Sequence, residues 1–212
     1  MKNTIIIASC FLFVLATGIR AQQDIHWNPD IEYGSFMDSR NGQVYNTVKI
    51  GNKTWMAQNF NLDVRKYSVI YEKDPTNATV YGRLYSWDSA REMAPAGWHL
   101  PTKEEWQELT EYLGGKKVAG GKMKEIGTVH WKEPNKGASN SSGFTALPGG
   151  ILQGRSFGDS FLHRNSEGYF WTASKYDNYY SWYVSLSSRE PEIYQNYCYH
   201  NSCLSVRYVK DD

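Results

Sequence analysis

The stretch GWHLPTKEEW, residues 97–106, places a histidine and two adjacent glutamates between two tryptophans. Imidazole and carboxylate groups serve as metal ligands and as proton carriers, so the stretch could in principle carry chemistry. The spacing favours a structural interpretation, because Thr102 followed three residues later by Glu105 is the capping box that begins a helix. We therefore expect His99 to be a packed or surface histidine rather than a ligand.

The residues after this stretch continue the predicted helix. Trp106, Leu109 and Leu113 recur at helical spacing, and Gly114-Gly115 marks the end of the pattern. Before the stretch, residues 87–93 can form a second, shorter helix that ends ahead of the next proline. Two helices are therefore expected.

A β-hairpin is predicted upstream of the helices. Residues 42–60 (GQVYNTVKIGNKTWMAQNF) contain two alternating runs around Gly51-Asn52, which is typical of a hairpin with a tight turn. The connection that follows includes Asp74-Pro75, a turn signal. Residues 120–168 are rich in Gly, Asn, Ser and Lys and have little periodicity, which predicts a long irregular region packed by its own side chains.

The C-terminal part of the chain predicts an antiparallel meander. Three runs rich in aromatic and β-branched residues are joined by polar turns, namely GYFWTAS (168–174), YYSWYVSLS (179–187) and CLSVRYV (203–209). Together with the hairpin and the helices, they predict an α+β domain in which helices lie beside an antiparallel sheet.

The N-terminal residues have the plan of a secretory signal peptide. A basic start and an apolar run from Ile5 to Ala16 lead to Ala21, a small residue suited to precede a cleavage site. Residues 1–21 are therefore predicted to be the signal peptide, 22–37 an extended leader and 38–212 the domain. The apolar run is too short for a stable membrane span, so we expect none in the mature chain.

An alternative for the N-terminus stays open. Ile7-Ala8-Ser9-Cys10 resembles a bacterial lipobox, whose cysteine would carry a lipid anchor. The apolar run before Cys10 is short for the core of a signal, which favours ordinary cleavage. On either reading we expect an exported protein, located in the periplasm, at the cell surface or outside the cell.

The charge content argues against nucleic-acid binding, and the two cysteines near the C-terminus favour a disulfide over a metal site. Lys and Arg number 23 against 22 Asp and Glu, and no dense basic patch occurs, whereas nucleic-acid binding needs clustered positive charge. Cys198 and Cys203 are predicted to form a small disulfide loop, as is common in exported proteins. A metal pair is less favoured, because the two cysteines are four residues apart and no second pair exists.

Six motifs in order resemble the Fibrobacter succinogenes major paralogous domain, a family common in exported proteins of Bacteroidetes and Fibrobacteres. The resemblance covers residues 38–212. The motifs are DSRNGQVYNTVKIGNKTWMAQNFN (38–61), YGRLYSWDSA (81–90), APAGWHLPTKEEWQELTEYLGG (94–115), GFTALPGG (143–150), GYFWTAS (168–174) and SVRYVKD (205–211). The family looks distantly related to the C-type-lectin-like fold, which includes formylglycine-generating enzymes. The resemblance implies this fold and a surface location but no particular reaction, because one fold hosts many functions.

Two chemical readings follow from these relatives. Glu133-Pro134-Asn135 is similar to the tripeptide with which some C-type lectins hold calcium and a sugar, but calcium needs six to eight oxygens and the usual partner motif is missing. Cys198 and Cys203 resemble the paired cysteines of formylglycine-generating enzymes, although here the pair runs directly into the last strand motif. We therefore expect no metal and no cofactor.

The aromatic run near the C-terminus suggests a ligand-binding surface. Alternation within residues 179–184 puts Tyr180, Trp182 and Val184 on one face and Tyr179, Ser181 and Tyr183 on the other. If one face is core, the exposed face forms an aromatic patch suited to interaction. The residues expected to contact a ligand are Trp131, Asn135, Asn140, Arg155, Asp159, Arg164, Tyr179 and Trp182.

The sequence offers no recognisable set of catalytic residues. We therefore expect a non-catalytic binding module for a glycan or a cell-envelope protein. Two alternatives remain, a cysteine/copper-dependent oxidase resembling formylglycine-generating enzymes and a structural protein of the envelope.

Overall fold

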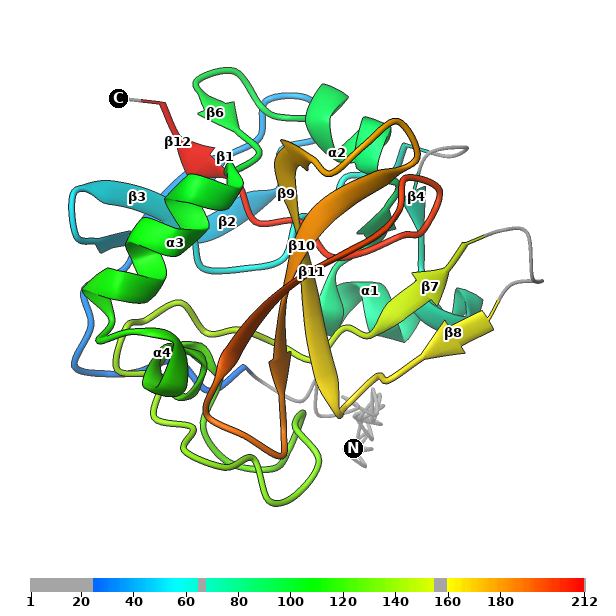
Figure 1. The fold of residues 1–212 in the computed structure, drawn as a ribbon. Coiled ribbons are helices and arrows are strands. Elements are labelled where there is room, and N and C mark those ends of the chain that lie inside the picture. The colour runs from blue at the N-terminus through cyan, green and yellow to red at the C-terminus, as the bar shows by residue number, and fades with distance from the viewer. Residues whose placement is uncertain (1–24, 65–67, 155–159, 212) are drawn as a thin grey trace, which may run out of the picture.

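A computed structural model describes residues 25–64, 68–154 and 160–211, so the predicted signal peptide and Cys10 lie outside it. The fold is a mixture of short helices and mostly antiparallel sheets, as predicted (Figure 1). One sheet has the order β1-β2-β3-β12-β6, and another has the order β11-β10-β9. None of the helices in the described ranges combines the length and hydropathy that crossing a bilayer requires.

The elements have the following bounds. The five-stranded sheet contains β1 (Gly34–Met37), β2 (Val44–Ile50), β3 (Lys53–Met56), β6 (Trp98–His99) and β12 (Val209–Lys210). The three-stranded sheet contains β9 (Glu167–Lys175), β10 (Tyr180–Ser187) and β11 (Ile193–Tyr199). Two small pairs are β4 (Ser68–Val69) with β5 (Leu84–Tyr85), and β7 (Ile151–Gln153) with β8 (Ser160–Leu162). The helices are α1 (Pro75–Tyr81), α2 (Trp87–Glu92), α3 (Lys103–Tyr112) and α4 (Lys116–Met123), with a 3₁₀ turn at Tyr71–Lys73.

The predicted hairpin and the helix at the capping box are confirmed. Strands β2 and β3 pair across Gly51-Asn52, with Ile50 opposite Lys53 and Gly51 at a positive φ of 64° that suits glycine. The Thr102 hydroxyl accepts from the Glu105 N–H (3.1 Å), and the Glu105 carboxylate accepts from the Thr102 N–H (2.8 Å). Helix α3 therefore begins where the sequence predicts.

Two helices were not predicted from the sequence. Asp74-Pro75 begins α1 instead of a turn, because the Asp74 carboxylate caps the Thr76 N–H and proline suits the first helical position. Helix α4 contains Gly120 and Gly121, which are poor helix formers. A Cβ at Gly120 would lie 2.4 Å from the Glu192 carbonyl oxygen, so glycine lets α4 pack against the start of β11.

The predicted meander is correct for two strands and wrong for the third. The third strand is β11, whereas residues 203–209 run through the core. Their last residue, Val209, belongs to β12 and pairs with Trp55 and His99 in the five-stranded sheet. A buried segment has the same residue types whether it forms a strand or crosses the core as irregular backbone. Composition therefore does not distinguish the two cases.

The predicted leader contributes to the fold. Strand β1 pairs with β2, which places residues 34–37 in the five-stranded sheet. Trp27, Ile31 and Tyr33 pack against the core cluster that contains Trp55 and Trp106. The packed part of the chain therefore begins before Asp38.

The buried Arg207 joins several of the sequence motifs. Its guanidinium donates to the Asn59 side chain (2.6 Å) and to the carbonyl oxygens of Met56 (3.1 Å), Phe144 (2.7 Å) and Thr145 (2.9 Å). Burial lowers the pKa of Arg207 to about 9, which leaves it protonated at neutral pH. Arg207 thus connects the motifs at residues 38–61, 143–150 and 205–211 inside the fold.

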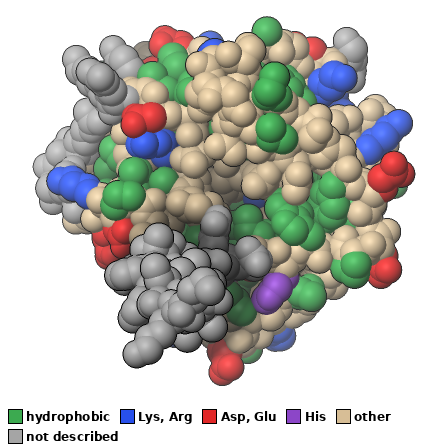
Figure 2. Space-filling model, turned by 180° about the vertical axis from the view of Figure 1, so that it is seen from behind, with side chains coloured by type: hydrophobic (Ala, Val, Ile, Leu, Met, Phe, Trp, Pro, Cys, Tyr) green, Lys and Arg blue, Asp and Glu red, His purple; other side chains and the backbone are tan. Residues whose placement is uncertain are grey.

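Charged side chains are spread over the surface. Seen from behind, basic and acidic side chains lie mainly near the rim, and hydrophobic side chains occur in separate patches among uncharged polar atoms (Figure 2). Among the described side chains on that face, positive charge does not form a continuous stripe.

Candidate functional site

Three of the predicted ligand-binding residues lie inside the fold. Trp131, Asn135 and Asn140 are 0%, 6% and 0% exposed. The Trp131 indole N–H donates to the Ala146 carbonyl (2.9 Å), and the Asn140 side chain bonds to both the hydroxyl (2.9 Å) and the N–H (2.8 Å) of Thr145. These side chains hold the irregular region together and are not part of the candidate site.

Of the remaining predicted residues of the irregular region, the structure describes Arg164, which does not line the groove between α3, α4 and β11. Arg155 and Asp159 lie outside the described residues. Arg164 bonds to the Asn77 side chain, and its guanidinium lies 5.2 Å from the Tyr71 ring centroid. It is thus tied to the segment around α1.

The geometry does not favour the hypothesis that residues 133–135 hold a calcium ion. The Asn135 amide turns inward and donates to the carbonyls of Glu125 (2.9 Å) and Gly127 (2.7 Å). Across the described ranges, no three His, Cys, Asp or Glu side chains are grouped to hold a metal ion.

The predicted disulfide is not formed in this structure. In the described part of the chain, Cys198 and Cys203 are both thiols. Cys198 lies on β11 and packs with the core cluster around Trp171, whereas Cys203 is buried with Leu152 in a different cluster. The two side chains belong to different apolar clusters, and burial raises the pKa of Cys198 to about 12.

The structure brings five aromatic side chains together on one side of the three-stranded sheet. Trp182 lies opposite Tyr197, and Tyr180 lies opposite Tyr199, in the register of β10 and β11. Tyr176 stacks on Tyr197 with ring centroids 3.9 Å apart and an interplanar angle of 8°, and Tyr180 and Tyr199 are 4.4 Å apart. We call this set, Tyr176, Tyr180, Trp182, Tyr197 and Tyr199, the aromatic face.

The aromatic face continues a sheet surface that helix α3 covers elsewhere. Val184 and Leu186, farther along the same side of β10, are buried beneath α3 with Trp106 and Leu109. The first residue of α3, Lys103, places its Nζ 3.8 Å from the Trp182 ring centroid. Past that point the sheet extends beyond the helix, which leaves its aromatic side chains open to solvent.

Exposure of these rings is high for aromatic residues. Tyr176, Tyr197 and Tyr199 are 48%, 40% and 46% exposed, and the neighbouring Tyr179 is 71% exposed. Tyr183 points to the other side and packs against Tyr169, with centroids 5.6 Å apart. The sequence therefore predicted an aromatic patch correctly, and its exposed part lies on the Trp182 side.

The neighbouring hydroxyls affect the ionisation of two of these tyrosines. The Tyr199 hydroxyl, together with burial, raises the pKa of Tyr180 to about 12, and the Tyr197 hydroxyl raises the pKa of Tyr176. Because a phenol ordinarily has a pKa of about 10, Tyr176 and Tyr180 are uncharged at physiological pH, and each offers a donor and an acceptor beside an apolar ring.

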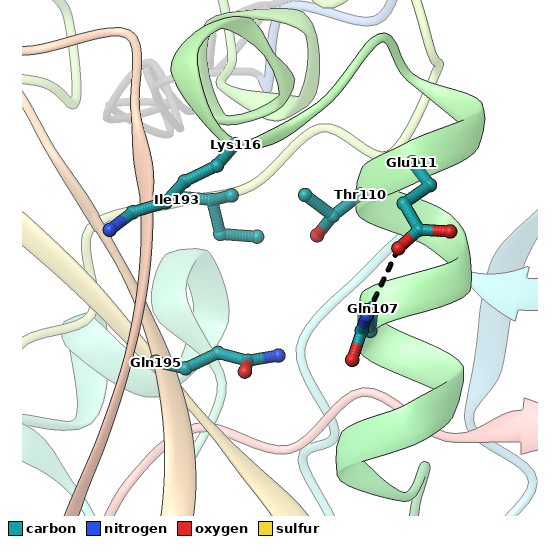
Figure 3. Close-up of a pocket in the computed structure, with 6 residues that line it drawn as sticks. All are labelled: Gln107, Thr110, Glu111, Lys116, Ile193 and Gln195. Carbon is teal, nitrogen blue, oxygen red and sulfur yellow. Dashed lines mark hydrogen bonds between the residues drawn. The ribbon is translucent and has the colours of Figure 1, made fainter.

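A polar groove adjoins the aromatic face. It has a volume of about 380 Å³ and lies between α3, α4 and β11 (Figure 3). Gln195 extends from β11 toward α3, where Gln107 donates to Glu111 (3.0 Å). The lining residues are Gln107, Thr110, Glu111, Lys116, Ile193 and Gln195. Gln195 is two residues from Tyr197 on the same strand, so the groove and the aromatic face share one side of β11.

Sequence reasoning missed the contribution of β11. Ile193, Gln195, Tyr197 and Tyr199 alternate along residues 193–199, which is a strand pattern. Both sides of this run mix polar and apolar residues, with Gln195 on one side and Asn196 on the other, so the pattern is weaker than that of the neighbouring strands. The alternation was the available signal for this half of the site.

Comparison with known proteins identifies the family but no closer relative. Neither the curated proteins nor the solved structures gave a significant match. The model of the Fibrobacter succinogenes major domain matches residues 48–210, which include α3, the groove and the aromatic face. The chain therefore belongs to the Fibrobacter succinogenes major domain family.

Proposed function

We propose that this protein is an exported, non-catalytic binding module whose ligand is a glycan. The observation that carries the proposal is the exposed aromatic face beside a polar groove. Flat aromatic rings bury area against a ligand while their polar tips stay available for hydrogen bonds. Exposed apolar patches of this kind mark interaction sites in soluble proteins.

The chemistry of the surface suits a sugar better than an apolar ligand. A pyranose ring has an apolar face of C–H groups and a rim of hydroxyls, which match tyrosine rings and neighbouring amides. Gln107, Thr110 and Gln195 supply uncharged donors and acceptors in the groove. Binding sites of this type combine apolar surface with a few polar groups that fix orientation.

The proposal includes a C-type-lectin-like fold. Antiparallel sheets, few helices and a long irregular region at residues 124–150 support it. The last strand, β12, returns to the sheet that contains the first strands. A crystal structure that superimposes poorly on C-type-lectin domains would contradict this part of the proposal.

A glycan array tests the function directly. We expect the purified mature protein to retain a restricted set of glycans, with no turnover of the retained sugars. An empty array together with capture of one envelope protein from solubilised membranes would favour the structural alternative. Chemical conversion of a bound glycan would contradict the non-catalytic proposal.

The cysteine/copper oxidase alternative is supported only by the thiol state of Cys198 and Cys203. Copper ligation requires accessible thiolates, whereas Cys203 is 1% exposed and the pKa of Cys198 is raised to about 12. The pair therefore fits a packing role better than a copper centre. Copper titration followed by elemental analysis tests this alternative, and stoichiometric uptake that depends on both cysteines would favour it.

A further inference from the structure

We infer that the groove and the aromatic face form one continuous site that binds a linear, uncharged polysaccharide along strand β11. The inference rests on the proposed glycan-binding function and names its ligand class. It also assigns separate roles to the two parts of the surface, stacking to the aromatic face and hydrogen bonding to the groove.

The geometry of β11 sets the length of the proposed site. Ile193, Gln195, Tyr197 and Tyr199 point to the same side, since side chains alternate along a strand. Because Ile193 is buried, the open track runs from Gln195 to Tyr199, and four residue steps at a rise of about 3.3 Å give it a length of about 13 Å. A track of that length is longer than one sugar and accommodates consecutive pyranose rings. A site for a single terminal sugar needs only a small cavity.

Strand β11 is accessible to a ligand. β11 is the edge strand of its sheet, with β10 as its neighbour. Gln195, Tyr197 and Tyr199, which point to the side of β11 that carries the aromatic face, are exposed. Helix α4 packs at the start of the strand, next to Glu192, and so bounds the groove end of the track. An extended chain can therefore lie on this surface with one end at the groove and the rest over the tyrosines.

The charge of the groove favours a neutral ligand. The groove contains one acidic and one basic side chain, Glu111 and Lys116, so it carries no net charge. The Lys116 ammonium lies 5.1 Å from the Tyr194 ring centroid, and Glu111 accepts from Gln107. Both charges are thus engaged by neighbours on the protein, as is Lys103 at the aromatic face, whose ammonium lies over the Trp182 ring. Acidic polysaccharides would need a basic cluster, whereas neutral hydroxyls match the amides and the threonine hydroxyl.

Titration calorimetry with a length series tests the inference. The probes are β-1,4-linked gluco- and manno-oligosaccharides from the disaccharide to the hexasaccharide, with a galacturonic acid hexamer as the acidic probe. We expect the Kd of the best neutral series to fall at least tenfold from disaccharide to hexasaccharide. The gain should level off once the sugar covers the strand, and the acidic hexamer should bind more weakly.

Two variants separate the parts of the site. Gln195→Ala should reduce the affinity for the hexasaccharide several-fold and leave that for the disaccharide nearly unchanged. Tyr197→Ala should weaken both, and Tyr112→Ala, which removes an exposed ring outside the site, should change neither. Thermal melting of each variant confirms that it is folded.

The outcomes distinguish this inference from the proposed function. Equal affinity for all chain lengths, or a stronger preference for the acidic hexamer, overturns the continuous neutral site and leaves glycan binding intact. An absence of binding across the series, together with an empty glycan array, contradicts both.

Discussion

Thr102 shows how a single side chain defines the start of a helix. Its hydroxyl and the Glu105 carboxylate satisfy each other's backbone N–H groups at the start of α3. Thr102→Ala removes one acceptor, so the free energy of unfolding should fall by about 1 kcal/mol. Urea denaturation measures the change, and Thr102→Ser is the matched control because it keeps the hydroxyl. A loss of ligand binding at unchanged stability would contradict the structural role.

Arg207 is a second residue whose role is structural. Arg207→Met would leave the Asn59 side-chain oxygen and three backbone carbonyls without their buried donor. Each unsatisfied group costs about 1–3 kcal/mol, so we expect destabilisation of at least about 3 kcal/mol. The same substitution at the exposed Arg189 serves as control and should be nearly neutral. Equal urea midpoints for the two variants would refute this account.

At the scale of elements, His99 connects four parts of the fold. Its Nδ1 lies 2.6 Å from an oxygen of Asp211, just after β12, and its Nε2 lies 3.0 Å from an oxygen of Glu105 on α3. Lys53 of β3 lies 3.1 Å from the same Glu105 carboxylate. The histidine in the stretch 97–106 thus belongs to a charge network that joins β6, α3, β12 and β3.

This network predicts a dependence of stability on pH. Burial lowers the pKa of His99, but the hydrogen bonds to Asp211 and Glu105 outweigh it, so the pKa is raised in the folded state. The stabilisation is therefore full below the unfolded pKa of about 6.5 and is lost as pH rises through the higher folded pKa.

Urea denaturation of the wild type and of His99→Gln on both sides of this interval measures the effect. The stability advantage of the wild type should shrink from about pH 6 to the alkaline side of the folded pKa. An NMR titration of the imidazole locates that pKa independently. An advantage that stays constant with pH, or an imidazole pKa below 6.5, would count against the network.

The elements that the sequence predicted are those with complete local signals. Helix α3 has its cap, its apolar spacing and its glycine stop within residues 102–115, and the hairpin has its turn at Gly51-Asn52. Helix α4 was missed because its two glycines are explained only by their contact with distant segments, among them Glu192. Strand β12 was missed because its partners, Trp55 and His99, are far away in the sequence.

The residues of the candidate site also differ in how far the sequence alone indicates them. Tyr179 and Trp182 could be picked out because aromatic residues cluster in one short run. The alternation of residues 193–199 indicates a strand, but the place of Tyr197 beside Trp182 could not be predicted, because it depends on the register of two strands. The residues chosen at 131–140 were misleading because a Gly- and Asn-rich composition indicates a loop but not whether tertiary contacts bury it.

Residues 26 and 27 are part of the packed structure. The His26 N–H donates to the Glu125 carboxylate (2.7 Å), and Trp27 packs edge-on against Tyr33 at 5.0 Å. The predicted cleavage after Ala21 would keep both contacts in the mature chain. Intact mass spectrometry of the exported protein should give a chain that begins at Gln22. A mass that includes a diacylglycerol-modified Cys10 would contradict this and establish the lipid anchor.

For the molecule as a whole, we propose that the aromatic face binds a glycan. Calorimetric titration of the double variant Tyr176→Ala/Tyr197→Ala with the best array ligand tests it most directly, with Tyr112→Ala as control. Because aromatic anchors dominate binding sites of this kind, we predict at least a tenfold higher Kd for the double variant, equivalent to about 1.4 kcal/mol or more. The control should bind like the wild type, and all three proteins should melt at similar temperatures. An unchanged Kd in a folded double variant would contradict the account.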